Sequence, residues 1–107
     1  MATSPIQIFN GLLTDVAGTA IGAVVPALTA IVLKEIILFN SGAAPNLVQI
    51  RLQGTAADTF NIVYETMASK ATLVLPFNTV MVAANALTGY ATTTAEVHCV
   101  VSGVKTV

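Results

Sequence analysis

The stretch VQIRLQ at residues 48–53 alternates strictly between apolar and polar side chains. Val48, Ile50 and Leu52 therefore lie on one side of an extended chain, and the polar residues lie on the other. This period of two is typical of a half-buried β-strand, because successive side chains of a strand point to opposite faces. The stretch therefore predicts a strand of a two-layered β-protein.

The same alternation recurs on the carboxyl-terminal side, at residues 59–66 and 95–102. The side chains predicted to face inward are Phe60, Ile62, Tyr64, Val97, Cys99 and Val101. The side chains predicted to face outward are Asn61, Glu65, Glu96, His98 and Ser102. Three alternating segments in one short chain favour an antiparallel sheet with one solvated face.

Residues 29–39 differ, because both faces of the predicted strand are apolar apart from the adjacent Lys34 and Glu35. One face would carry Ile31, Leu33, Glu35, Ile37 and Phe39, and the other Ala30, Val32, Lys34, Ile36 and Leu38. A strand that is apolar on both faces is buried on both faces. In a small antiparallel domain, we expect another chain or a segment folding over it to cover the second face.

Turn-forming residues separate the predicted strands at intervals of roughly 8–12 residues, which is typical of a sandwich or barrel. The expected turns are residues 40–46, 54–58, 67–70, 76–78 and 83–86, with a short helical turn at 83–87 as an alternative. The predicted fold is all-β, an antiparallel β-sandwich of jelly-roll or immunoglobulin-like type with about 7–9 short strands. We expect this sandwich domain to cover residues 16–107.

The first fifteen residues, 1–15, allow two interpretations. Ile6, Ile8 and Phe9 form a short apolar patch behind Pro5. The segment is either the first strand of the sandwich or an arm that docks on a neighbouring chain, since an added edge strand is a common mode of peptide recognition.

The chain is unusually poor in charge: 8% of its 107 residues are charged, against about 25% in a typical soluble domain. A folded monomer of 11.0 kDa exposes roughly 5,600 Å² of surface. Nine charged side chains are few for that area. Much of the surface is therefore expected to be covered by other chains or by a membrane.

The membrane alternative, such as a lysis factor, depends on the uncharged run at residues 16–33, which approaches the length of a bilayer span. Pro26 lies within this run and would kink a helix there. The second uncharged run, residues 71–95, contains many threonines and asparagines and is too polar for lipid. We therefore expect no membrane partner. The amino terminus lacks the basic region of a secretory signal.

The residues offer little for catalysis or ligand chemistry. His98 and Cys99 are adjacent and point to opposite faces of a strand, so they cannot form a nucleophile–base pair. Asp15, Asp58 and Glu65 have no metal-binding spacing. With a net charge of −1 and no basic patch, we expect no nucleic acid partner. We predict no enzyme activity, no cofactor and no metal.

Two remaining residue types limit the alternatives further. Cys99 is the only cysteine, which excludes an internal disulfide and fits assembly in a reducing cytosol. Sugar-binding modules need exposed aromatic platforms. The chain has no tryptophan, and Tyr64 is predicted to face inward, which leaves Tyr90 as the candidate for a receptor- or carbohydrate-binding site.

Several short motifs occur in a fixed order: Pro26, TAIVLKEIIL (29–38), FNSGA (39–43), LVQIRL (47–52) and VVSGV (100–104). This order resembles a group of short tailed-bacteriophage virion proteins, over roughly residues 24–104. The Gly-Asp usual in the last third of that group is absent, and residues 86–89 read ALTG here. The resemblance implies a jelly-roll or sandwich building block and no catalytic residues.

The leading interpretation is a bacteriophage virion structural protein: a capsid decoration or cement protein, homotrimeric, that binds the major capsid protein or other virion proteins. The expected location is the capsid surface, with the tail second, after assembly in the host cytoplasm. A tail, baseplate or fibre-base protein is the first alternative, and a receptor- or carbohydrate-binding module is the second. The candidate interface residues are Ile6, Ile8, Phe9, Val63, Val74 and Val100. We expect aspartate at Val63 or Val100 to disrupt self-association.

Overall fold

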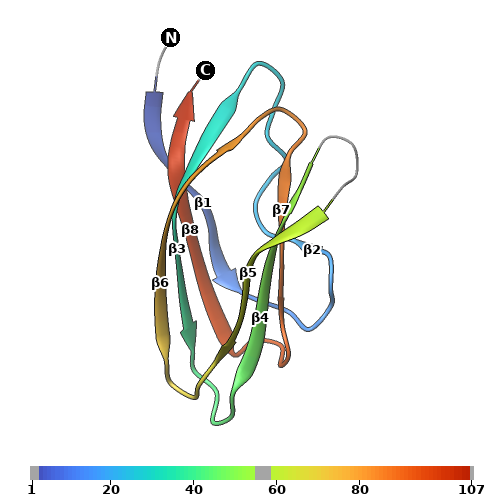
Figure 1. Ribbon diagram of the computed structural model, residues 1–107, viewed down its shortest axis with the longest axis vertical. Coiled ribbons are helices and arrows are strands. Elements are labelled where there is room, and N and C mark those ends of the chain that lie inside the picture. Colours follow the sequence, from blue (N-terminus) through green and yellow to red (C-terminus); the bar gives the residue numbers. More distant parts are fainter. Residues whose placement is uncertain (1–2, 55–58, 107) are drawn as a thin grey trace.

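The computed structural model describes residues 3–54 and 59–106, which form eight β-strands (Figure 1). The strands are β1 (Thr3–Leu12), β2 (Thr19–Ala20), β3 (Ala30–Asn40), β4 (Asn46–Gln53), β5 (Thr59–Met67), β6 (Thr72–Met81), β7 (Ala86–Ala91) and β8 (Val97–Thr106). No helix in this part of the chain is long and apolar enough to cross a membrane.

The strands form two antiparallel four-stranded sheets, with strand orders β1-β8-β3-β6 and β2-β7-β4-β5. The last strand lies between the first and the third, and sheet neighbours are mostly distant in sequence. This is the arrangement of an eight-stranded jelly roll, in which two sheets pack face to face. The predicted all-β sandwich is therefore confirmed. Its accessible surface is 5592 Å².

The core between the sheets contains most of the side chains that were predicted to face inward. The alternation of β4 is confirmed, because Val48, Ile50 and Leu52 are buried. That of β8 is also confirmed: Val97, Cys99 and Val101 are buried, whereas the intervening residues are exposed or half-buried. The other buried apolar residues are Leu13, Ile21, Val25, Ile31, Leu33, Ile36, Leu38, Val63, Met67, Met81, Leu87 and Ala91.

A β-bulge in β5 makes the predicted orientation of Tyr64 wrong. Ile50 pairs with Val63 but Arg51 pairs with Asn61, so Ile62 is an extra residue. One extra residue reverses the alternation beyond it. Val63, predicted to face outward, is consequently 4% exposed in the core, and Tyr64 is 61% exposed. The side chain of Phe60 and most of the expected 54–58 loop lie outside the described residues.

A second bulge, at Lys34, divides β3. The register against β8 moves from Leu33 directly to Glu35, so the two halves of the strand have opposite phase. Ile31 and Leu33 face the core before the bulge, and residues 36 and 38 face it after the bulge. The predicted division of residues 29–39 into two continuous faces is therefore wrong. One face is fully buried and the other is partly exposed.

The turn predicted at residues 76–78 is also wrong, because β6 continues through it. Proline is tolerated there since β6 is an edge strand that pairs with β3 alone, so a missing N–H can face away from the sheet. The alternative helical turn at 83–87 is a simple turn at residues 83–84 followed by β7. The loops expected near residues 41–45 and 68–70 are confirmed.

The first strand, β1, pairs with β8 at the edge of its own sheet, and the two chain ends lie side by side (Figure 1). A register shift between Gln7 and Phe9 makes Ile8 an additional residue. Ile6, Ile8 and Phe9 are half-buried and pack against the core. The sandwich end that holds both termini also contains the β2–β3 and β6–β7 connections, and it is called the terminal end below.

Candidate interaction surfaces

The outer side of the β1-β8-β3-β6 sheet carries rows of aliphatic side chains and is called the apolar face. Strand register places Val100, Ile37 and Val74 side by side across three strands. A second row holds Val104, Val32 and Val80. The apolar face consists of Leu12, Val32, Ile37, Phe39, Val74, Val80, Val100 and Val104.

Several of these side chains are well exposed. Val74 is 54% exposed and Val80 is 58% exposed, both on the edge strand β6, and Phe39 is 38% exposed. Those on the central strands are half-buried by their neighbours. The few charges include Glu35, in the row between the two aliphatic rows, and Lys34, whose Nζ donates to Asn78 Oδ1 at 2.9 Å. Covering this face would contribute about 25 cal/mol per Å² of apolar area.

The outer side of the β2-β7-β4-β5 sheet is hydrophilic and is called the polar face. It carries Gln49, Arg51, Gln53, Asn61, Tyr64, Thr66, Thr88 and Tyr90. Arg51 Nε donates to Asn61 Oδ1 at 3.2 Å, which ties two neighbouring strands together. Tyr90, Gln49 and Tyr64 form one cross-strand row, so the two tyrosines flank the glutamine.

The predicted interface residues fall into three environments. Val74 and Val100 lie on the apolar face, where they are available for contacts. Ile6, Ile8 and Phe9 pack against the core from the edge strand β1. Val63 is a core residue, and its assignment as an interface residue is wrong because the bulge at Ile62 turns it inward.

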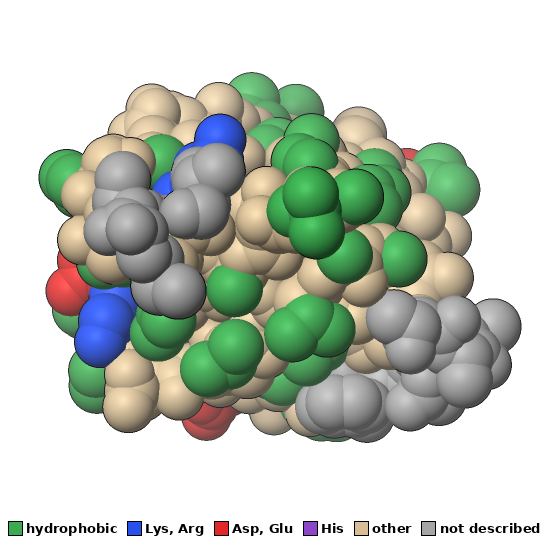
Figure 2. Space-filling model, turned by 90° about the horizontal axis from the view of Figure 1, so that it is seen from above, with side chains coloured by type: hydrophobic (Ala, Val, Ile, Leu, Met, Phe, Trp, Pro, Cys, Tyr) green, Lys and Arg blue, Asp and Glu red, His purple; other side chains and the backbone are tan. Residues whose placement is uncertain are grey.

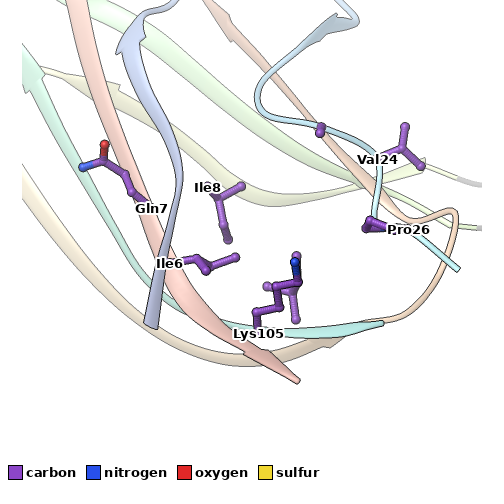
Figure 3. A pocket seen from close by; sticks show the side chains of 8 residues that line it. Ile6, Gln7, Ile8, Val24, Pro26 and Lys105 are labelled. Atoms are coloured by element: carbon purple, nitrogen blue, oxygen red, sulfur yellow. The ribbon is translucent and has the colours of Figure 1, made fainter. Parts of the chain in front are cut away.

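A pocket of about 280 Å³ opens between β1 and the β2–β3 connection. Figure 3 shows Ile6 and Ile8 on β1 facing Pro26 across this pocket, with Lys105 below them. The remaining lining residues are Gln7, Ala23, Val24 and Ile31. The two segments approach closely at Gly22, where a Cβ would lie 2.7 Å from the carbonyl oxygen of Ile8.

The terminal end also carries protruding hydrophobic side chains. Figure 2 looks onto this end and shows hydrophobic side chains gathered over it. Leu28 is 94% exposed, and Val24 and Val82 are about half exposed. Leu28 also has a φ of 60°, in the left-handed region. A non-glycine residue in that region costs roughly 1–2 kcal/mol, so the turn places a hydrophobic side chain in water at a backbone cost.

The opposite end of the sandwich is closed by hydrogen bonds. The buried Asn40 donates through Nδ2 to the carbonyls of Ala44 (3.0 Å) and Met67 (3.2 Å), and its Oδ1 accepts from Asn46 Nδ2 at 3.0 Å. Asn46 also donates to Glu96 Oε1 at 3.2 Å. No buried side-chain N or O atom in the described residues lacks a partner. This network therefore holds the loops at this end in place and pairs the buried side-chain polar atoms of the described residues.

The residues considered for catalysis are separated as predicted. Cys99 points into the core, where burial raises the pKa of its thiol to about 12. His98 lies on the opposite side of β8, with Nε2 2.6 Å from Asn10 Oδ1. Among residues 3–54 and 59–106, no three His, Cys, Asp or Glu side chains gather as a metal site. Asp58 lies outside those residues.

Comparisons with known proteins find solved structures with a similar fold. No family model matches the chain, and no curated protein matches it in sequence. A chain of the infectious bursal disease virus (IBDV) particle resembles it with a TM-score of 0.59 and 10% identity over 99% of this chain. A chain of the Gx strain of the virus gives 0.57, with 10% identity over 99%.

These matches establish the architecture. The protein has an eight-stranded jelly-roll fold that is similar to part of these virus-particle chains. It spans about a third of the length of the viral chains, 31% and 33% respectively. The fold is thus shared with one part of a larger virus-particle protein. The expectation of a jelly-roll sandwich is confirmed, and the virion role and the resemblance to bacteriophage proteins stay predictions.

Sequence reasoning missed two features of these surfaces. The row in which Tyr64 and Tyr90 flank Gln49 was hidden by the bulge at Ile62, which leaves no mark in an apolar stretch. The sequence indicated the protrusion of Leu28 only weakly. Leu28 lies in a Pro-Ala-Leu-Thr turn, and glycine or asparagine is usual at a turn residue with positive φ.

Proposed function

We propose that this protein is a virion structural protein, specifically a capsid decoration or cement protein of a bacteriophage that acts as a homotrimer. The observation that carries the proposal is the apolar face of a capsid-type jelly roll. The proposed role is to bind neighbouring virion subunits and to stabilise the lattice through that face. It requires shape and buried area, and no catalysis or cofactor.

The dimensions of the apolar face support this role. Strands of about ten residues in a four-stranded sheet span on the order of 600 Å². A standard interface buries about 800 Å² per partner. The whole outer side of this sheet, its polar residues included, is therefore comparable in size to one side of an interface.

The low charge of the chain fits a protein that works in many copies. With 8% charged residues, the isolated subunit has little to keep neighbours apart. Within a lattice, several modest contacts act together, and effective concentration makes their combined binding much tighter than any single contact.

The test is the copy number of the chain in purified virions, measured by quantitative mass spectrometry against the major capsid protein. Hundreds of copies per particle support the decoration or cement role. A handful to a few tens assign it to the tail, baseplate or fibre base. Absence from particles overturns the virion proposal.

A second candidate, a receptor- or carbohydrate-binding module, is favoured by the Tyr90–Gln49–Tyr64 row. Two aromatic rings beside a polar side chain offer stacking surfaces and hydrogen bonds to a sugar. The test is binding of the purified chain to a glycan array, with Tyr64→Ala and Tyr90→Ala as variants. Glycan binding that either variant abolishes supports this candidate, and no binding by the unmodified chain removes it.

A further inference from the structure

Leu28 combines two unfavourable features at one position. Its side chain is 94% exposed, and its backbone adopts a φ of 60°. Glycine would adopt this conformation without penalty and would expose no hydrophobic side chain. Lys70, Ala84 and Ala95 also have positive φ, and Leu28 differs from them in exposing a large aliphatic side chain. Strained residues cluster at functional contacts.

The same end of the molecule carries a cavity with matching chemistry. The pocket between β1 and the β2–β3 connection is lined mainly by Ile6, Ile8, Val24, Pro26 and Ile31. Its polar lining residues are Gln7 and Lys105 (Figure 3). Leu28 of the same chain does not line it, so the pocket is not filled by its own loop.

We propose that Leu28 of one copy inserts into this pocket of a second copy, so that the terminal end is a contact between copies of the chain. The contact uses a surface other than the apolar face. It does not depend on the virion role, because it requires only two copies of this protein.

Size and composition identify a second copy as the occupant. The pocket volume of about 280 Å³ accommodates a branched aliphatic side chain and leaves room for part of its turn. Every copy carries both the protruding leucine and the pocket, so two copies of this chain can form the contact without another protein. A contact between two different patches closes into a ring when the rotation permits. Val24, on the same connection as Leu28, and Val82, directly after β6, are also exposed at this end and are available to extend the contact.

The expected strength of this contact is modest. Burying one leucine side chain changes an association constant by about 10- to 100-fold. The purified chain should therefore associate reversibly as its concentration rises. Removal of the leucine should weaken each contact by that same factor.

The experiment is sedimentation equilibrium of the full chain and of variants over a wide concentration range. Leu28→Gly removes the leucine and relieves the backbone, so association should weaken at least tenfold while the melting temperature stays equal or rises. Ala84→Gly is the matched control: Ala84 is exposed at the same end with a φ of 71°, and its replacement should leave association unchanged.

Ala23→Trp tests the pocket independently. Ala23 is exposed and lines the pocket, so a tryptophan there fills the cavity without entering the core. It should weaken association as strongly as Leu28→Gly. A mixture of the two variants should then regain association, because one supplies an intact leucine and the other an intact pocket.

Three results would contradict the insertion of Leu28 into the pocket. A chain that stays monomeric at millimolar concentration overturns the contact, as does association that Leu28→Gly leaves unchanged. Failure of the mixture to exceed either variant alone overturns the insertion of leucine into the pocket. None of these outcomes alters the copy number in virions, so this inference and the proposed function fail separately.

Discussion

The apolar face and the polar face are built by the same fold and differ only in their outward residues. On the polar face, β4 places Gln49, Arg51 and Gln53 outward, opposite the inward Val48, Ile50 and Leu52. On the apolar face, the outward positions of β3, β6 and β8 include six valines and isoleucines, which form two rows beside polar residues such as Asn78 and His98. Folding of a single chain requires apolar residues only on the inward side. We propose that the outward aliphatic rows of this sheet serve contacts beyond the chain.

The largest expected effect is a difference in the free energy of unfolding between a variant at an inward valine and a variant at an outward valine. Val63→Asp places a carboxylate in the core and should lower the free energy of unfolding by about 4 kcal/mol or more. Val74→Asp, on the apolar face, should change it by about 1 kcal/mol or less. Urea denaturation of both variants measures the difference. Equal destabilisation would mean that the apolar face is needed for folding itself.

Cys99, on the inward side of the same sheet, makes the free energy of unfolding depend on pH. Burial raises the pKa of its thiol from 9.0 to about 12, so the thiolate forms more readily in the unfolded chain. The associated stability is fully present below pH 9 and is lost as pH rises toward 12. Between pH 9 and about pH 10.5, the wild type should lose about 2 kcal/mol more than Cys99→Ala. Parallel pH profiles would contradict the burial of this thiol.

The prediction with the smallest effect on the isolated chain concerns incorporation into particles. It compares one residue on each of two edge strands. Val74 on β6 and Tyr64 on β5 are similarly exposed and lie on opposite outer faces. Val74→Asp should lower incorporation into particles at least tenfold, because a carboxylate would be desolvated against an apolar partner surface. Tyr64→Asp should leave incorporation unchanged. Mass spectrometry of purified particles measures both, and the reverse ranking would transfer the docking role to the polar face.

Much of the fold could be predicted because β4 and β8 keep an uninterrupted period of two. Their inward residues, such as Ile50 and Cys99, were assigned from alternation alone. The bulges at Lys34 and Ile62 could not be predicted, since a one-residue insertion in a largely apolar strand leaves both phases looking acceptable. Pro76 gave a false turn because edge pairing, which permits proline in a strand, depends on strand order.

The interaction surfaces were predicted less completely than the fold. Val74 and Val100 were correctly placed outward, whereas Val63 was not, because one bulge reversed its direction. The gathering of aliphatic side chains into rows depends on pairing between strands that are distant in sequence, such as that of Val100 with Ile37. The pocket likewise joins β1 to the β2–β3 connection, a contact that no local pattern encodes.

Docking through the apolar face is tested most directly by hydroxyl-radical footprinting of the chain, free and within purified particles, read at Phe39 and Tyr64. Both are exposed aromatic residues, one on each outer face. We expect oxidation of Phe39 to fall at least fivefold in particles and that of Tyr64 to change less than twofold. Equal oxidation of Phe39 in the free and particle-bound chain would contradict the assignment of the apolar face as the docking surface.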